Sequence, residues 1–320
     1  MSTSALEALT GAVGAAAPVT LAALNERSEL LVRFDRSYLV PTETFLRIAE
    51  QLTAPGCPGG PFRALEIGGR RVFRYRSVYY DTPGLRSFHD HRQGRRVRFK
   101  IRERVYEDSG ERQFEIKVKG RRGSTVKHRR RLAGSERVLE GECGRFLADT
   151  LRHSCGLGTP DGLKPSLRTD YTRATLVAAG QRVTCDAGLS CVEPDTGRIV
   201  RCDPGLVLVE TKTAGRLSDT DRMLHAQGLR PAVFTKYCGG LAALRPDLTA
   251  NRWRRATRRV FPSGESVRSG ESGGGPGRRR CLSPSAGQVP GLPPGSATPA
   301  TGRPVPPERA SPRSHRRAGR

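Results

Sequence analysis

The sequence contains few aromatic residues and no long apolar run. Aromatic side chains make up 6% of its 320 residues, and there is a single tryptophan. Base stacking on nucleic acid needs exposed aromatic side chains, and most of those present fall on faces that we expect to be apolar. Nucleic-acid binding by the main domain therefore ranks last among the functions considered. No stretch of about 18 apolar residues occurs, so we expect no transmembrane helix.

Several catalytic motifs are also missing. There is no GxxxxGK[ST] segment and no Gly-rich loop that opens a helix after a strand, which argues against P-loop enzymes and kinases. The six histidines lie in no recognisable nucleophile setting, which argues against Ser-His-Asp and Cys-His hydrolases. The eight cysteines form no CxxC pair, so we expect free thiols in a reducing, cytoplasmic environment rather than disulfides or a zinc site.

Positive charge is abundant. The chain has 56 Lys and Arg against 31 Asp and Glu, a net charge of +25. Residues 262–320 consist mainly of Gly, Pro, Ser and Arg and carry +7 of this charge, which leaves +18 on residues 1–261. The composition predicts a disordered basic tail, suited to weak, salt-dependent contact with nucleic acid or a membrane surface. The charge on the remainder indicates a polyanionic partner there as well.

The rest of the chain divides into an Ala-rich flexible leader over 1–25 and a folded domain over 26–261. Strand patterns dominate the domain. We expect strands at 29–40, 71–81, 95–106, 113–119, 125–132, 166–178, 181–186, 206–212 and 233–237. We expect helices at 42–52, 136–153, 218–227 and 241–258.

Charged and apolar residues alternate along these strands. Successive side chains of a strand point to opposite faces, so residues 96–104 place their cations on one face and their apolar side chains on the other. The cations of this face are Arg96, Arg98, Lys100, Arg102 and Arg104. Similar alternation recurs at 114–119, 125–131, 182–186 and 207–212. One such strand is typical of a solvated sheet, but five predict an α+β fold in which an antiparallel β-barrel tunnel with flanking helices turns its charged faces inward around an anion.

Three acidic residues share these charged faces: Glu115, Asp186 and Glu210. Mg²⁺ and Mn²⁺ prefer oxygen ligands, and Mg²⁺ usually takes one or two carboxylates while phosphates and waters complete its shell. The pattern therefore favours a phosphate site that also holds Mn²⁺ or Mg²⁺. The alternative, that each acid balances a neighbouring lysine, stays open.

An ordered series of segments resembles the VTC-type polyphosphate polymerase domain of the triphosphate tunnel metalloenzyme (CYTH-like) superfamily. The segments are 33–40, 77–83, 96–102, 114–117, 127–129, 171–173, 182–186, 209–212 and 234–237. The resemblance implies an antiparallel barrel that transfers a phosphoryl group from ATP or another nucleoside triphosphate onto inorganic polyphosphate, with Mn²⁺ or Mg²⁺.

Carried over by position, the resemblance also implies roles for individual residues. The catalytic cations would be Arg96, Arg98, Lys100, Lys127, Arg129, Lys212 and Lys236. The other phosphate-binding residues would be Arg33, Arg102, Lys117, Arg173, Arg182 and Tyr237. Glu210 would be the principal metal ligand, with Glu115 and Asp186 as supports.

The first strand departs from the family pattern. The family has Glu-x-Lys where this chain has Asp35-Arg36-Ser37, so Ser37 supplies no cation. Three functions stay open: a polyphosphate polymerase, a triphosphate or polyphosphate hydrolase of the same fold, and a non-catalytic module that binds polyphosphate or another polyanion.

Overall fold

The computed structural model describes residues 3–27, 34–119, 125–178, 180–213, 217–262 and 267–268. Arg33 and nearly all of the expected tail, 262–320, lie outside the described residues. None of the described helices is long and apolar enough to span a membrane. The seven cysteines in the described ranges are buried free thiols, as their spacing predicted.

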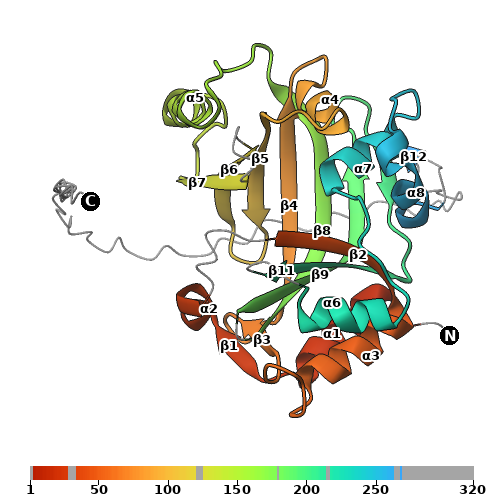
Figure 1. Cartoon of the computed structure of the whole chain (residues 1–320). Helices are drawn as coiled ribbons and strands as arrows, with labels where there is room; N and C mark the ends of the chain where they lie inside the picture. Colours follow the sequence, from red (N-terminus) through yellow and green to blue (C-terminus); the bar gives the residue numbers. More distant parts are fainter. Residues whose placement is uncertain are drawn as a thin grey trace, which may run out of the picture. The chain divides into compact units, whose positions relative to one another are not determined.

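The fold is α+β and is built on one large, mainly antiparallel sheet (Figure 1). Its strands are β1 (Pro18–Thr20), β2 (Phe34–Pro41), β3 (Arg63–Glu66), β4 (Val72–Asp81), β5 (Arg98–Tyr106), β6 (Glu111–Lys119), β7 (Thr125–Leu132), β8 (Lys164–Ala178), β9 (Gln181–Val192), β10 (Arg198–Arg201), β11 (Leu206–Thr213) and β12 (Val267–Arg268). Neighbouring strands follow the order β7-β6-β5-β4-β8-β9. From β9 the sheet continues in two directions, to β11 and β2 and to β10 and β12.

The branch at β9 follows from an irregularity in its pairing. The register between β8 and β9 shifts between Asp170 and Thr172, opposite Gly188. Gly188 has a φ of 64°, a conformation that costs glycine little and other residues more. The shift bends β9, as bulges do, so that residues 181–186 pair with β11 while residues 190–192 pair with β10.

Eight helices surround the sheet in the described part of the chain. They are α1 (Ala5–Ala15), α2 (Leu21–Arg27), α3 (Thr42–Thr53), α4 (Arg86–Arg92), α5 (Gly141–Cys155), α6 (Asp219–Ala226), α7 (Lys236–Leu244) and α8 (Asn251–Val260). The expected strand at 233–237 is absent: Thr235 caps α7 instead, accepting a hydrogen bond from the Cys238 N–H. The expected helix 241–258 is two helices, because Pro246 interrupts the chain between α7 and α8.

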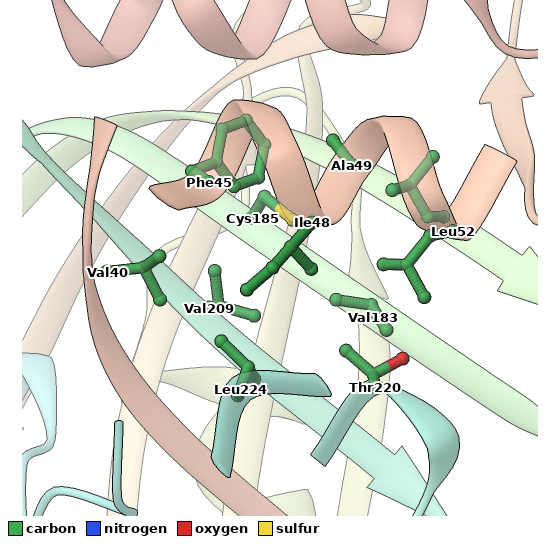
Figure 2. Close-up of a pocket in the computed structure, with 11 residues that line it drawn as sticks. Val40, Phe45, Ile48, Ala49, Leu52, Val183, Cys185, Val209, Thr220 and Leu224 are labelled. Atoms are coloured by element: carbon green, nitrogen blue, oxygen red, sulfur yellow. The ribbon is translucent and has the colours of Figure 1, made fainter. Parts of the chain in front are cut away.

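Helix α3 packs on the outer face of the sheet. Phe45, Ile48 and Leu52 point from one side of α3 toward Val183 of β9 and Val209 of β11 (Figure 2). A void of about 10 Å³ remains between them, lined almost entirely by apolar side chains. Such a space holds about one water at most, so it is a packing defect and no ligand site.

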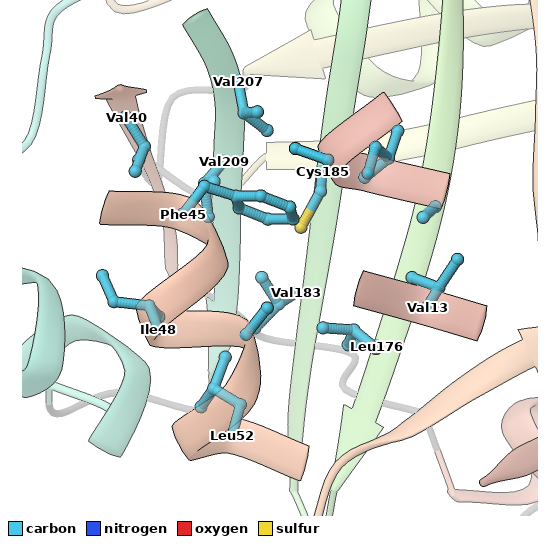
Figure 3. Close-up of a cluster of buried hydrophobic side chains, with 14 of the residues drawn as sticks. Val13, Val40, Phe45, Ile48, Leu52, Leu176, Val183, Cys185, Val207 and Val209 are labelled. Atoms are coloured by element: carbon cyan, nitrogen blue, oxygen red, sulfur yellow. The ribbon is translucent and has the colours of Figure 1, made fainter. Parts of the chain in front are cut away.

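Helix α1 joins the same hydrophobic cluster, which differs from the flexible leader expected over 1–25. Ser4 and Glu7 form a capping box that starts the helix. Leu9 and Val13 are buried, and Figure 3 shows Val13 beside Leu176 of β8. The Ala-rich composition therefore supplies a small apolar helix face that packs on the sheet.

Candidate active site

The strand register brings most of the predicted site residues onto one face, which we call the basic face. On one side, Lys212 of β11 lies opposite Arg182 and Asp35, and Glu210 lies opposite Thr184 and Ser37. On the other side, β5, β6 and β7 align their side chains in two rows. These rows are Lys100, Lys117 and Lys127, and Arg102, Glu115 and Arg129.

The opposite face of the same strands is apolar. Phe99, Ile101 and Phe114 are fully buried in a cluster with α5. This burial confirms the alternation that the sequence predicted for β5 and β6. An ion pair of 3.7 Å between Lys117 of β6 and Asp35 of β2 then connects strands that are not neighbours in the sheet. The basic face is therefore concave, with β2 facing β6 across it.

Glu115 lies at the centre of a group of cations on β5–β7. Its carboxylate is 2% exposed and accepts hydrogen bonds of 2.6 Å from Arg102 Nε and Lys127 Nζ. The guanidinium groups of Arg129 and Arg104 lie 3.7 and 4.0 Å away. Burial alone would raise the pKa of Glu115, but the surrounding cations outweigh burial and hold that pKa well below its usual value. Glu115 is therefore ionised and fixes the positions of several cations.

Asp186 plays the same part on β9. It receives a bidentate pair from Arg173, with Nε and Nη2 at 2.6 and 2.8 Å, and a contact from the Lys236 ammonium at the start of α7. Burial opposes ionisation, but Arg173 and Lys236 lower the pKa of Asp186 to about 2. Asp186 thereby links α7 to the sheet and holds Lys236 at the edge of the basic face.

Glu210 differs from the other two acids in its exposure. Its side chain is 36% exposed, whereas those of Glu115 and Asp186 are almost fully buried. It contacts Lys212, whose ammonium also donates to Thr184 Oγ1 at 3.0 Å. Burial would raise the pKa of Glu210, but Lys212 and Arg173 outweigh burial and lower it. Glu210 is thus an ionised carboxylate that still reaches the space above the basic face.

Three predicted site residues do not lie among these groups. Arg96 is exposed in the bend before β5, and Arg98 turns back to donate from Nη1 to the Arg95 carbonyl at 2.5 Å. Tyr237 is 2% exposed, and its hydroxyl donates to buried Asp81. This hydroxyl is therefore used to position α7, and the phosphate-binding role of Tyr237 stays a prediction.

Sequence reasoning missed an aromatic part of the basic face. Tyr75 of β4 stacks on Tyr171 of β8, with ring centroids 5.4 Å apart and planes 9° apart. The Arg173 guanidinium lies 5.3 Å from both rings, and the Lys236 ammonium lies 4.5 Å from Tyr171. The rings attract these two cations in addition to their contacts with Asp186. The sequence signal for this aromatic part was the alternation of Tyr75, Ser77 and Tyr79 on β4. These three side chains are uncharged, so a search for cations did not find them.

Ser37 stands where the family pattern has a lysine, and it lies on β2. Ser37 lies opposite Glu210 in the β2–β11 pairing. The neighbouring Arg36 does not replace the missing cation, because its guanidinium lies on the other side of β2, 3.2 Å from Asp221. Two ammonium groups lie nearby: that of Lys212, which contacts Glu210, and that of Lys117, which reaches Asp35 from β6.

Comparison with known proteins identifies the family. Residues 32–245 match the family model of the VTC domain. This chain belongs to the VTC domain family. The match spans β2 to the end of α7 and so covers every strand of the basic face; α8 lies beyond it. No curated protein matches the chain.

Among solved structures, a candidate adenylate cyclase from Bacillus halodurans is similar at 18% identity, with a TM-score of 0.38, over 64% of this chain and 94% of that one. A candidate adenylyl cyclase from Hippeastrum, described as having a dominant triphosphatase activity, matches at 13% identity and a TM-score of 0.34, over 68% and 97% of the two chains. The RNA triphosphatase Pct1 of S. pombe matches at 12% identity and a TM-score of 0.22, over 67% of this chain and 61% of that one. Scores this low establish neither a shared activity nor a shared substrate.

The donor set of the VTC domain fits a metal ion at one carboxylate. The described residues contain no group of three or more His, Cys, Asp or Glu side chains that could enclose a metal by themselves. Glu115 and Asp186 have their oxygens bound to Arg and Lys, whereas Glu210 is accessible. Mg²⁺ is commonly held by one or two carboxylates together with phosphate oxygens and waters. Glu210 with a bound phosphate chain would match that requirement.

The contact between Tyr237 and Asp81 leads to a prediction about stability. We expect Tyr237→Phe to lower the free energy of unfolding by about 1–3 kcal/mol, because the buried Asp81 carboxylate loses a donor. Asp81 keeps the backbone N–H groups of Ser87 and Phe88. Urea unfolding measures the loss. Tyr80→Phe is the matched control, since the Tyr80 hydroxyl makes only a 3.4 Å contact with Glu103; equal losses in both variants would contradict the anchoring role.

Lys127 leads to a prediction about pH. Burial lowers the pKa of Lys127 to about 6, with Arg102, Arg104 and Arg129 adding to the effect and Glu115 opposing it. The unfolded chain therefore binds more protons than the folded one between about pH 6 and about pH 10, so this lysine makes the protein more stable as pH rises through that window. In the folded protein Lys127 loses its charge around its pKa of about 6, so we expect it to contribute less to tripolyphosphate binding as pH rises past this value.

The matched reference for Lys127 is Lys127→Arg, which keeps its charge. We expect the tripolyphosphate affinity of the wild type, relative to this variant, to fall by about tenfold between about pH 5 and about pH 8. Titration calorimetry of both proteins measures the ratio of their tripolyphosphate affinities. Protonation of tripolyphosphate affects both affinities equally and so does not change this ratio. A ratio that does not change with pH would show that Lys127 stays charged throughout.

Proposed function

We propose that this VTC domain is a metal-dependent phosphotransferase that binds a nucleoside triphosphate such as ATP and elongates inorganic polyphosphate. The observation that carries the proposal is the concave basic face, where cations outnumber carboxylates even though each of Glu115, Asp186 and Glu210 contacts a cation. Such a surface has a large unmet positive charge. A chain of phosphates offers the matching geometry, because each phosphate presents oxygens to the Arg forks.

The reaction needs little beyond this arrangement. Phosphoryl transfer requires in-line positioning of donor and acceptor and positive charge around the transferred group, with no covalent nucleophile from the protein. The two reactants, the nucleoside triphosphate and the polyphosphate, would be held from opposite sides. One would be held through its phosphates from the β5–β7 side by Lys100, Lys117 and Lys127. The other would be held through its oxygens from the β8–β11 side by Lys212, Arg173 and Lys236. Mn²⁺ or Mg²⁺, held at Glu210, would supply charge at the phosphoryl oxygens between them.

We also propose that the basic face closes into a tunnel. The Lys117–Asp35 ion pair across the concave face supports a tunnel, since it brings β2 within reach of β6. A closed wall would exclude water and strengthen each contact between cation and phosphate. It would also favour transfer to a phosphate chain over transfer to water.

Hydrolysis of triphosphate or polyphosphate is the second candidate. Ser37 favours it, because the position opposite Glu210 holds a small hydroxyl in place of the family's lysine. A missing cation there would weaken the hold on an acceptor chain, and water could take the acceptor's place.

Incubation of the full chain with ATP and Mn²⁺ separates the candidates. Products are run on a gel stained for polyphosphate, and free phosphate is assayed in parallel. Metal-dependent long chains would establish the polymerase, and phosphate without chains would establish the hydrolase. Neither product, with tripolyphosphate still bound, would leave a module that holds phosphate chains without turning them over.

A further inference from the structure

Helix α8 carries a second concentration of positive charge. Over Asn251–Val260 it has five arginines and no acidic residue. Trp253, Thr257 and Val260 are buried and attach the helix to the domain, while the arginines are exposed. Figure 1 shows α8 next to α7. We call Arg252, Arg254, Arg255, Arg258 and Arg259 the arginine face.

The arginine face lacks balancing charge. Among the residues that the structure describes, Arg254, Arg255, Arg258 and Arg259 form no ion pair, whereas the exposed Arg145 of α5 pairs with Glu142. Cations four residues apart on a helix repel one another, so the pairs 254/258 and 255/259 destabilise α8 unless an anion lies between them. Asn251 and the last four arginines line an open groove of about 610 Å³ where an anion could lie.

The arginine face continues toward the basic face. Arg252 Nη1 donates to the His91 carbonyl at 3.4 Å and lies beside Gly94. Arg98 donates to the carbonyl of Arg95, the residue that follows Gly94. Burial lowers the pKa of Arg98, and the charge of Arg252 lowers it further. Cations therefore follow one another from Lys100 through Arg98 and Arg252 onto α8.

The surroundings of α8 select among polyanions. Nucleic acid would need exposed aromatic side chains for its bases, but Trp253 is buried. A membrane would need apolar side chains beside the arginines, but those of α8 point into the domain. Residues 262–320 carry a net +7 and would be repelled, as would the same face of a second copy. A bare chain of phosphates needs only cations.

We propose that the arginine face of α8 binds the segment of an inorganic polyphosphate chain that extends beyond the basic face. The inference rests on the proposed function and deepens it, since it assigns a place to the part of the chain that does not react. It predicts that affinity depends on chain length: a long chain reaches both faces, and tripolyphosphate reaches only the basic face.

The test uses the full chain and two probes, tripolyphosphate and long-chain polyphosphate. The variant is Arg254→Gln, Arg255→Gln and Arg258→Gln combined, with Arg137→Gln, Arg145→Gln and Arg152→Gln as a control that removes equal charge on and before α5. We expect the α8 variant to lose at least about tenfold in affinity for the long chain. We also expect the salt dependence of log K to become shallower by roughly 2, at about 0.7 for each phosphate contact. Tripolyphosphate binding should not change, and the control should match the wild type.

Three results would overturn the inference. An unchanged affinity of the α8 variant for the long chain, with tripolyphosphate bound normally, removes the role of α8 and leaves the proposed function standing. If the wild type binds neither probe, both the role of α8 and the proposed function are contradicted. A greater loss of affinity for single-stranded DNA or for anionic lipid vesicles than for polyphosphate would assign the arginine face to a different partner.

Discussion

Glu210→Gln is expected to reduce metal-dependent turnover by a factor of about 100 or more, the size of effect seen when one group that stabilises charge at a reacting oxygen is lost. Glu210 is the one of the three predicted metal ligands whose carboxylate is accessible on the basic face. The amide keeps the size of the side chain but loses the charge that would hold Mn²⁺ or Mg²⁺. Turnover of ATP is measured over a range of Mn²⁺ concentrations.

Tripolyphosphate binding without metal distinguishes this role from a general loss of the site. Removing a negative charge beside Lys212 should leave that affinity unchanged or raise it. Glu50→Gln, on the exposed side of α3, is the matched control and should behave as the wild type. Normal turnover of Glu210→Gln at every Mn²⁺ concentration would show that the metal is held elsewhere.

Glu115→Gln is expected to lower the free energy of unfolding by about 3–5 kcal/mol. The substitution leaves Arg102, Lys127 and Arg104 close together with no anion between them. A buried group of like charges destabilises the folded state, and urea unfolding measures the loss. Saturating tripolyphosphate should restore part of the stability, because a bound phosphate supplies the missing negative charge.

Glu111→Gln on the same strand is the control for this variant. Glu111 is partly exposed and lies 4.0 Å from Arg131, so its loss should cost about 1 kcal/mol or less. If both substitutions had the same small effect, the cations around Glu115 would not depend on it. A large loss of stability that tripolyphosphate does not restore would mean that phosphate does not reach this part of the basic face.

The sequence predicted the basic face well because strand geometry is local. A period of two assigns each side chain to a face, so the common side of Lys100 and Arg102 on β5 followed from the order of residues alone. The strand pairings that join β5–β7 to β9 and β11 were not predicted, since alternation does not tell which strands are neighbours and the resemblance to the family implied only an antiparallel barrel. The roles of these residues in catalysis stay predictions.

Other features depend on tertiary contacts that no local pattern reveals. The direction of the Tyr237 hydroxyl follows from Asp81, which is 156 positions away in the sequence. The Ala-rich stretch of α1 is helical because β8 and β9 offer it an apolar surface. The segment at 233–237 has residues typical of a strand, but Thr235 caps a helix there because α7 packs on β8 and β9.

The buried carboxylates Glu115 and Asp186 have a consequence for movement along the basic face. In the proposed reaction an elongating chain would have to advance past its binding groups, and a surface of cations alone would hold it in one place. Glu115 offers Arg102 and Lys127 a substitute partner when a phosphate departs, and Asp186 offers one to Arg173 and Lys236. Exchange between a fixed carboxylate and a passing phosphate would keep the energies of successive chain positions close to one another, so that the chain could slide along the basic face.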